Sequence, residues 1–498
     1  LARQDQDWRL ALAVYREAID HVRREFAPDL VINLTPSEPA RLMAMSLGAA
    51  ELRGFALDDH GFNADTSAWA AFLQLASSSR GASPFNIVDI FRRISGLCGA
   101  PGGEGASFGL RGPTQAARAE ALIRLRSALA TAPAKGYVAL QLGASEDRRR
   151  WPVERFAQVA RGLWHAGYAP VLVGTTEEKG LGLRLRELLN TPVTTPVPTP
   201  VIDLLGQTGL PELAAVLAAC RLLVTNDTGT MHLAAGLGVP CLAIFLATAQ
   251  PWDTGPYLPG SICLEPDLDC HPCGFGQACG SSEACRQAIA PDSVLGLALA
   301  MLRAGATGGG MGDALSDGMS NGMSDGGARV WRTVINAGPG ADGLMDLVSL
   351  SGHEGQDRTR FIRLQRALYR RYLDGEPLDM AAAPAGLAGP GAGLSADAAG
   401  PLNSALGAAS EFLFLLERQG QLLGHNPLKS VQAKFLATWQ RVQSSLSADP
   451  RLTMLSSLWM FESERPGLDM PEILALTVRF RALIDALRVA IGPGTDHA

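Results

Sequence analysis

The sequence lacks three features that would place it in a common class. No run of about 18 uncharged apolar residues occurs, so we expect no membrane-spanning helix. The formal net charge is −6, whereas a general nucleic-acid-binding protein usually carries a basic face, so we expect no nucleic-acid partner. The first residues do not follow the basic, apolar and small-residue order of a secretory signal peptide.

Cysteine is scarce over most of the chain and concentrated in one short stretch. Four of the eight cysteines lie in DCHPCGFGQACGSSEAC, with the spacing C-x2-C-x5-C-x5-C. Two interpretations stay open. The thiols are structural, either reduced or disulfide-linked, or they bind zinc or an iron–sulfur cluster, although the later spacings differ from the common zinc pattern. We assign no metal, and the alternative ligand set is Cys270, Cys273, Cys279 and Cys285.

Short β-rich runs alternate with amphipathic helical stretches from residue 29 to about residue 303. DLVINLT (Asp29–Thr35) predicts a buried strand, and a new series begins at YVALQLG, residues 137–143. Further strands are expected at 169–174, near Val201–Leu204, at 221–226 and at 241–245, and helices at 152–166, 176–190, 211–220 and 230–238. This alternation predicts an α/β fold with a parallel, doubly wound sheet.

Composition divides the chain into four predicted regions. Residues 1–112 form an incomplete N-terminal Rossmann-like domain, and residues 113–303 form a second, complete one. The Gly-rich repeat at 304–328 predicts a flexible linker. Residues 329–498 are expected to be a mostly helical accessory region, interrupted by a disordered Ala/Gly/Pro tract near 381–402. Within it, SGHEGQDRTRF (Ser351–Phe361) is interpreted as a helix start with a solvated polar face.

The stretch VTNDTGTMHLAAGLGVP places polar residues in the turn between a predicted strand and the helix that follows it. Ligands of open parallel sheets bind beyond the carboxyl ends of the strands, and a helix N-terminus favours an anion. Asp227, Thr228, Gly229 and His232 are therefore candidate binding residues. The alternative is that Asp227 only caps the helix and that His232 lies at the edge of the core.

Two further strand ends carry side chains suited to a nucleotide. LGASEDRRRWPVERF places Arg148–Arg150 after one strand, and arginine binds phosphate through two parallel hydrogen bonds. VLVGTTEEKG places Glu177 and Glu178 after the next strand, where a carboxylate can accept hydrogen bonds from ribose hydroxyls. Taken alone, an arginine triplet is more often a solvated face, and the two glutamates are an ordinary acidic first helical turn.

Together, three segments resemble the heptosyltransferases, the family-nine glycosyltransferases that build the lipopolysaccharide core, with the heptosyltransferase II type closest. The resemblance covers about residues 8–303. Its segments are LGASEDRRRWPVERFAQVA, VLVGTTEE and LLGQTGLPELAAVLAACRLLVTNDTGTMHLAAGLGVP. The last carries the family's D-[ST]-G-x-x-H-[LIV]-A-A pattern, beginning at Asp227.

The resemblance implies a glycosyltransferase-B fold of two Rossmann-like domains. It also implies transfer of heptose with inversion from ADP-heptose to a lipopolysaccharide core acceptor, with no cofactor and no metal. The implied donor-binding residues are Ser145, Arg149, Glu178, Asp227, Thr228, Gly229 and His232. Arg149 stands where the family's K-x-W-P motif usually has lysine. A cytoplasmic location is implied, either free or peripheral on the cytoplasmic face of the inner membrane.

One family feature is missing from this sequence. The family's general base is an aspartate in a G-D motif after the first strand, and no such motif precedes DLVINLT. We therefore expect the chain to begin after that segment and assign no catalytic residue. Three functional hypotheses remain. The first is a heptosyltransferase, and this chain is then either an active form or an inactive fragment of it. The second is a non-catalytic nucleotide-sugar-binding or scaffold protein, and the third is an enzyme that uses another nucleotide sugar.

Overall fold

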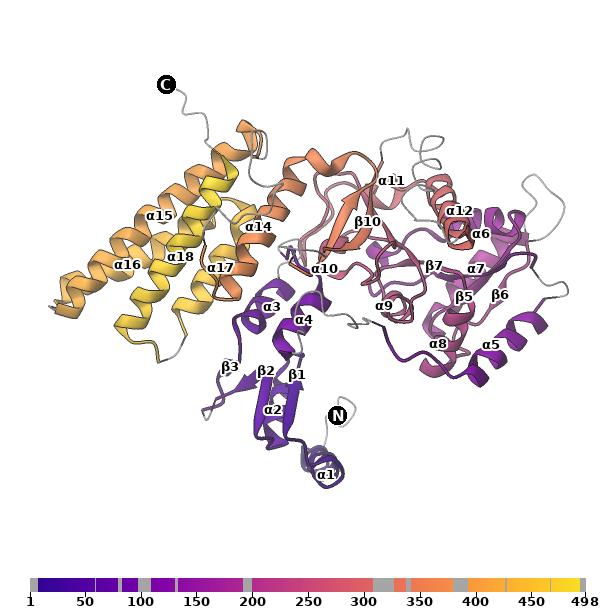
Figure 1. Cartoon of the computed structure of the whole chain (residues 1–498), viewed down its shortest axis with the longest axis horizontal. Coiled ribbons are helices and arrows are strands. Elements are labelled where there is room, and N and C mark those ends of the chain that lie inside the picture. Colours follow the sequence, from indigo (N-terminus) through magenta and orange to yellow (C-terminus); the bar gives the residue numbers. More distant parts are fainter. Residues whose placement is uncertain are drawn as a thin grey trace. The chain divides into compact units, whose positions relative to one another are not determined.

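The computed structural model describes most of the chain, and its residues cluster into two compact units (Figure 1). The described residues are 8–58, 60–78, 83–96, 109–129, 133–190, 199–307, 327–336, 342–378, 393–425, 428–465 and 467–492. Unit 1 comprises Leu1–Ala82, Ile87–Pro101 and Arg360–Ala498; unit 2 comprises Ser83–Asn86 and Gly102–Thr359. Most of the predicted linker at 304–328 and of the predicted disordered tract at 381–402 lies outside the described residues.

Unit 2 is built on an eight-stranded sheet with the order β11-β10-β9-β8-β7-β4-β5-β6. Strands β4 to β9 pair in parallel. Their bounds are β4 Gly136–Gln141, β5 Tyr168–Val173, β6 Ile202–Asp203, β7 Leu222–Asn226, β8 Cys241–Ile244 and β9 Ile262–Pro266. The parallel, doubly wound sheet predicted from the sequence is confirmed, because every strand expected after residue 137 is present within a few residues of its predicted position.

Two additional strands extend this sheet beyond β9. β10 (Ala328–Ile335) pairs antiparallel with β9, and β11 (Met345–Ser349) pairs antiparallel with β10. The sequence analysis expected a mostly helical region from residue 329 and named no strand there, so these two strands are an addition to it. The stretch RVWRTVI has β-branched and aromatic residues, but two arginines interrupt its hydrophobic pattern, and the structure buries Arg329 in an ion-pair cluster.

Helices cover both faces of the sheet in unit 2 (Figure 1). Helices α6, α7 and α12 pack beside one another, and α5, α8 and α9 form a second group. Their bounds are α5 Gln115–Ser127, α6 Val153–His165, α7 Lys179–Asn190, α8 Leu210–Ala219, α9 Gly229–Gly236 and α12 Pro291–Thr307; α10 Pro251–Thr254 and α11 Ala284–Ala288 are short. Because the parallel strands are apolar on both sides, each face of the sheet needs such a cover.

The core of unit 2 lies between the sheet and these helices. Val138, Leu140, Val224 and Leu242 of the central strands are fully buried. Phe156 of α6 is also fully buried and packs edge-on against Trp151, with ring centroids 5.0 Å apart. Fully burying one such side chain contributes about 1.5–3 kcal/mol, so the strand ends that carry the polar loops rest on a rigid base.

Among its described residues, unit 1 contains a small sheet and helices from both ends of the chain. β1 (Leu30–Asn33) pairs in parallel with β2 (Glu51–Leu57), and β3 (Asn63–Asp65) pairs antiparallel with β2. The N-terminal helices are α1 Trp8–Phe26, α2 Glu38–Ser46, α3 Ala68–Ser78 and α4 Ile87–Ser95. The C-terminal helices are α14 Asp357–Leu373, α15 Ala396–His425, α16 Lys429–Leu446, α17 Thr453–Ser463 and α18 Met470–Ile491.

Polar contacts join the two ends of the chain within unit 1. Asp374 accepts a hydrogen bond from the indole of Trp69 at 2.8 Å and pairs with Arg93 at 2.8 Å. Arg41 is fully buried and binds Asp65 at 2.8 Å. The sequence analysis treated the N-terminal segment and the C-terminal helices separately, whereas the contacts of Asp374 with Trp69 and Arg93 place them in one body. The fold class, α/β with a predominantly helical C-terminal region, is confirmed.

Candidate functional site

The strand order of unit 2 creates one position where the direction of winding reverses. From β4 the chain moves outward through β5 and β6, and it then returns to the other side of β4 for β7, β8 and β9. The loops after β4 and β7 therefore leave the sheet side by side and turn in opposite directions. In open α/β sheets this switch point is where ligands bind, beyond the carboxyl ends of the strands.

Asn226, the last residue of β7, holds these two loops together. Its Nδ2 donates to the carbonyl oxygens of Leu142 and Gly143, each at 3.0 Å, and its Oδ1 accepts from the backbone N–H of Trp151 at 3.0 Å. The side chain is fully buried. Both ends of its side-chain amide thus bind the loop after β4 and tie this loop to β7. The sequence analysis did not single out Asn226, because one polar residue ending an apolar run carries no periodic signal.

Three of the predicted donor-binding residues are in direct contact at this switch point. The Arg149 guanidinium donates from Nη1 to Ser145 Oγ at 2.8 Å and from Nη2 to the Asp227 carboxylate. Arg149 and Asp227 are only 9% and 8% exposed, so this ion pair is largely removed from water. It links the loop after β4 to the loop after β7.

The other two arginines of the triplet pair with different carboxylates. Arg148 pairs with Glu146 at 2.7 Å, and Arg150 pairs with Asp147 at 2.6 Å. Both pairs are local in sequence and partly exposed. The triplet therefore divides into one buried arginine at the switch point and two arginines in solvated ion pairs. The strand-end pattern alone does not distinguish the three arginines, whereas the family resemblance singled out Arg149.

Thr228, Gly229 and His232 lie at the start of α9, which follows Asp227 directly. Thr228 is the N-cap residue but provides no side-chain cap; its hydroxyl lies 3.3 Å from that of Thr225. Gly229 is exposed, and within the described residues no atom lies within 4 Å of the position that a Cβ would take there. The Thr228 carbonyl oxygen accepts a hydrogen bond from the Met231 N–H at 3.1 Å, so the N–H groups left without a side-chain cap are those at the very start of α9.

His232 also lies in the first turn of α9. Burial lowers the pKa of its imidazole, and the nearby Asp227 carboxylate only partly opposes this shift. The ring can therefore donate or accept a hydrogen bond at this edge of the sheet, but it does not add a fixed positive charge. The positive charge of the site comes from Arg149.

Glu178 is held at the end of the neighbouring strand β5 by several contacts. Its carboxylate accepts hydrogen bonds from Gln141 Nε2 at 2.8 and 3.0 Å and from the backbone N–H of Thr175 at 2.7 Å. A Cβ at Gly143 would lie 1.4 Å from Glu178 Oε1, and one at Gly174 would lie 1.8 Å from Oε2. Two glycines thus make the space that this carboxylate occupies.

Gln141 connects Glu178 to the start of α9. Its Oε1 accepts a hydrogen bond from Thr230 Oγ1 at 3.1 Å while its Nε2 donates to Glu178. Gln141 is 3% exposed and ends β4. All seven predicted donor-binding residues therefore lie around the carboxyl ends of three adjacent strands, β5, β4 and β7. Gln141 and Asn226 are the connecting residues that the sequence analysis missed.

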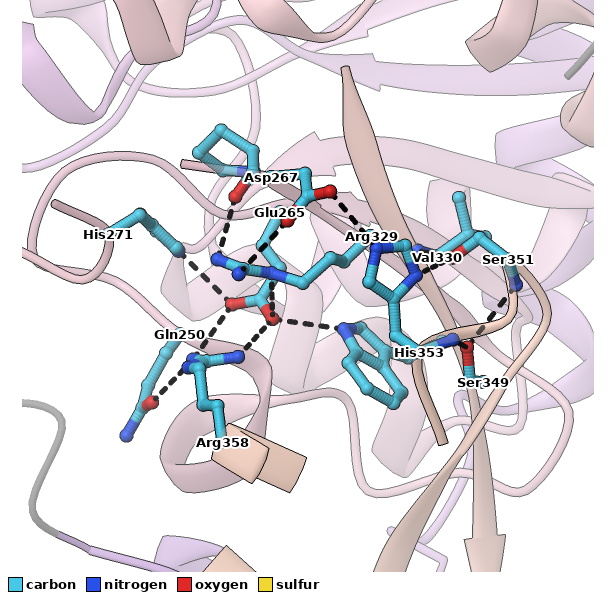
Figure 2. Close-up of polar contacts among 12 residues, drawn as sticks. Gln250, Glu265, Asp267, His271, Arg329, Val330, Ser349, Ser351, His353 and Arg358 are labelled. Atoms are coloured by element: carbon cyan, nitrogen blue, oxygen red, sulfur yellow. Dashed lines mark hydrogen bonds and ion pairs between the residues drawn. The ribbon is translucent and has the colours of Figure 1, made fainter. Parts of the chain in front are cut away.

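A second polar cluster lies beyond the carboxyl end of β9 (Figure 2). The buried carboxylate of Glu265 lies between two guanidinium groups, those of Arg329 at 3.2 Å and Arg358 at 2.7 Å. His271 Nε2 is 3.1 Å away, and the indole of Trp331 donates at 3.0 Å. Burial alone would raise the pKa of Glu265, but Arg358, His271 and Arg329 outweigh it and hold that pKa well below its usual range.

This cluster corrects the interpretation of residues 351–361 as a solvated face. Arg358, at the start of α14, binds Glu265, and His353 is buried between Ser351 Oγ at 2.8 Å and Asp267 at 3.2 Å. The helix start was predicted correctly, but its polar groups serve a buried network. Every partner comes from a distant part of the sequence, so no local pattern indicates them. The cluster joins β9, β10 and the first residues of α14, up to Thr359, all of which belong to unit 2.

The four clustered cysteines are free thiols in this structure. Among the described residues, no group of three or more His, Cys, Asp or Glu side chains is arranged to hold a metal ion. The structure therefore offers no support for the alternative ligand set Cys270, Cys273, Cys279 and Cys285. Likewise, no helix in the described part of the chain is long and apolar enough to cross a membrane.

A pocket of about 700 Å³ lies within unit 1. Its lining mixes both charges, from Asp58, Glu462 and Glu472 to Arg465 and Arg479. None of the predicted donor-binding residues lines it, because they all belong to unit 2. The candidate site is therefore the switch point of unit 2.

Comparison with known proteins matches part of this chain to one family. Residues 105–279 match the model of glycosyltransferase family 9 (heptosyltransferase). Lipopolysaccharide heptosyltransferase 2 of Escherichia coli (strain K12) is 35% identical over 97 residues, which are 20% of this chain and 27% of that protein. Lipooligosaccharide heptosyltransferase 2 of Haemophilus influenzae is 32% identical over 104 residues, which are 21% of this chain and 29% of that protein. The matches thus span less than a third of the length of these relatives.

Two solved structures are also similar. The glycosyl transferase family 9 protein from Veillonella parvula DSM 2008 has a TM-score of 0.45 and 21% identity, covering 58% of this chain and 78% of that one. The E. coli ADP-heptose lps heptosyltransferase II has a TM-score of 0.43 and 20% identity, covering 59% of this chain and 82% of that one.

Proposed function

From the premise that residues 105–279 form a glycosyltransferase family 9 (heptosyltransferase) domain, we propose that this chain binds a nucleotide-sugar donor and transfers its sugar. The donor is of the ADP-heptose type, and the acceptor is a lipopolysaccharide core sugar. The names of the relatives, lipopolysaccharide and lipooligosaccharide heptosyltransferase 2, support this choice. A cytoplasmic location, free or on the cytoplasmic face of the inner membrane, belongs to the same proposal.

The contact of Arg149 with Ser145 and Asp227 carries the proposal. It joins the loops after β4 and β7 at the switch point, beside the start of α9, where Thr228 provides no side-chain cap. A diphosphate at this position meets a guanidinium on one side and the first N–H groups of α9 on the other. Both favour an anion, because the helix dipole adds to the charge of the guanidinium. Asp227 orients Arg149 and limits its movement when no ligand is bound.

Glu178 and Gln141 supply the contacts for the nucleoside. The Glu178 carboxylate is fixed at the end of β5, next to the strand that leads to Arg149. A carboxylate in this place accepts hydrogen bonds from ribose hydroxyls, as in other nucleotide-binding sheets of this type. The order diphosphate, ribose and base then runs from β7 across β4 towards β5.

The proposed chemistry is a displacement at the anomeric carbon of the donor. A hydroxyl oxygen of the acceptor forms a bond to that carbon while the bond to the diphosphate oxygen breaks, so the configuration inverts. ADP leaves with additional negative charge, which Arg149 and the N–H groups of α9 stabilise more strongly in the transition state than in the ground state. The acceptor proton passes to a general base that we do not assign. No metal or cofactor enters this reaction.

The test is nucleotide binding by the full chain, followed by transfer. We expect calorimetry to show ADP binding, with UDP at least about tenfold weaker. Arg149→Ala and Asp227→Ala should each weaken ADP binding, whereas Arg150→Ala is the matched control because that arginine is in a solvated pair. If neither substitution changes ADP affinity, the site assignment is wrong.

Donor and acceptor are tested separately. Incubation with ADP-heptose and a heptose-deficient lipopolysaccharide core should release ADP and add one heptose to the acceptor, as measured by mass spectrometry. Binding of ADP-heptose without any transfer would instead support a non-catalytic nucleotide-sugar-binding or scaffold protein. Transfer from a UDP-sugar but not from ADP-heptose would support an enzyme that uses another donor.

A further inference from the structure

The cysteine cluster divides into an inner pair and an outer pair. Cys285 is buried and Cys273 half-buried, and both contact the backbone of Ala247, just after β8: the Cys273 N–H donates to the Ala247 carbonyl at 2.8 Å, and the Cys285 thiol also hydrogen-bonds Ala247. Cys270 and Cys279 are exposed. The inner pair is therefore part of the packing at the edge of the sheet, and the outer pair is open to solutes.

The two outer thiols face the same hydroxyl group. Ser281 Oγ lies 3.7 Å from Cys270 Sγ and 3.5 Å from Cys279 Sγ. The two sulfurs therefore share one hydrogen-bonding partner, although the cysteines are nine positions apart in the sequence. A disulfide needs its sulfurs about 2.05 Å apart, so the two thiols must leave the Ser281 hydroxyl and approach each other to form one. Gly276, at φ +69°, lies between the two cysteines in the sequence, and Gly280 follows Cys279. At both glycines the position that a Cβ would take is open space.

The environments of the outer and inner thiols differ chemically. The Ser281 hydroxyl and the backbone N–H groups of Glu283 and Ser281 stabilise the Cys279 thiolate and lower the pKa of this thiol. Burial raises the pKa of Cys273 and of Cys285. The thiolate is the reactive form of cysteine, so Cys279 is the most reactive of these three.

We propose that Cys279 and Cys270 form a thiol–disulfide exchange site for low-molecular-weight disulfides of the glutathione disulfide class. The Cys279 thiolate attacks one sulfur of the small disulfide, whose S–S bond breaks and releases one thiolate. The Cys270 thiolate then attacks Cys279 Sγ in the resulting mixed disulfide and displaces the second small thiolate. Two protein thiols are oxidised to one disulfide, the small disulfide is reduced to two thiols, and the two thiol protons pass to the released thiolates.

The experiment uses the reduced, desalted full chain and glutathione disulfide. After timed incubation, the reaction is quenched with acid, free thiols are alkylated, and peptides are mapped by mass spectrometry. We expect a Cys270–Cys279 disulfide as the first protein product. Cys270→Ser should accumulate glutathione on Cys279, because the resolving thiol is gone. Cys279→Ser should slow oxidation of the cluster about tenfold, and Ser281→Ala should slow it about threefold by weakening the thiolate.

Cys273→Ser is the matched control in the same loop, and we expect it to leave the rate of Cys279 modification within about twofold of wild type. Thermal unfolding of each variant checks that the loop change has not disrupted unit 2. Three results would overturn the proposal: oxidation at an unchanged rate in Cys279→Ser, a first disulfide that involves Cys273 or Cys285, or purified protein whose four thiols are already bound to stoichiometric zinc.

Discussion

From the buried ion pair between Arg149 and Asp227 we predict that the two residues act together on ADP affinity. Testing this prediction requires the double variant as well as the two single substitutions. If a donor diphosphate binds beside this pair, removing Arg149 deletes a charged hydrogen bond to phosphate, which contributes about 1.5–3 kcal/mol. It also leaves Asp227, only 8% exposed, as an unpaired carboxylate facing the ligand. We therefore expect Arg149→Ala to weaken ADP binding by about 2–4 kcal/mol, a factor of roughly 30 to 1,000.

The double variant separates these two contributions. Asp227→Ala alone should weaken ADP binding by about 1 kcal/mol, because Arg149 loses the partner that orients it. Arg149→Ala/Asp227→Ala should bind ADP more tightly than Arg149→Ala, because the unpaired carboxylate is gone. The expected coupling between the two positions is about 1–3 kcal/mol.

Calorimetry at one fixed ionic strength measures this cycle, and thermal unfolding of each variant reports separately on the folding cost of breaking a buried pair, about 3–5 kcal/mol. Effects on ADP affinity that add within about 0.5 kcal/mol would refute the reasoning, because the two side chains would then act independently on the ligand. The same conclusion would follow if the double variant bound ADP more weakly than either single variant.

The sequence allowed the alternating strands and helices of unit 2 to be predicted because their signals are local. The predicted strand at 169–174 is β5, Tyr168–Val173, and the predicted helix at 152–166 is α6, Val153–His165. Both are bounded by changes of hydrophobic period that a short window contains. The polar loop at Asp227 was found for a related reason, since a strand end followed directly by a helix is visible in the sequence. Its role in donor binding stays a prediction.

Residues that act across long distances in sequence were not predictable in the same way. Asn226 and Gln141 each end an apolar strand, and their partners lie on other strands and loops. The contacts of Glu265 were harder to predict, because its partners Arg329 and Arg358 come from a region that was expected to be a mostly helical accessory part of the chain. A charged residue in a strand pattern weakens the hydrophobic signal, and only the fold shows that its charge is compensated.

Three further predictions follow from particular contacts. Glu265→Gln should lower the free energy of unfolding by about 3–5 kcal/mol, because two guanidinium groups lose their buried carboxylate, whereas the exposed Glu154→Gln should change it by less than about 0.5 kcal/mol in the same denaturant titration. The pKa of His232 in the folded chain is lowered from its ordinary 6.5. As the pH falls, the unfolded chain therefore binds a proton at this residue at a higher pH than the folded chain does. The folded state loses stability as the pH falls below 6.5. His232→Gln should therefore lose less stability than wild type between about pH 6.5 and pH 5, and equal losses would show that the imidazole does not titrate differently in the two states. Gly143→Ala tests the position of Glu178, because the added Cβ would lie 1.4 Å from its Oε1 and must displace the carboxylate from β5. If this carboxylate binds ribose, ADP affinity should fall about tenfold while pyrophosphate affinity stays unchanged, and Gly180→Ala, where a Cβ meets no described atom within 4 Å, should change neither. An equal loss for ADP and pyrophosphate would mean that the substitution disturbs the diphosphate loop and not a ribose contact.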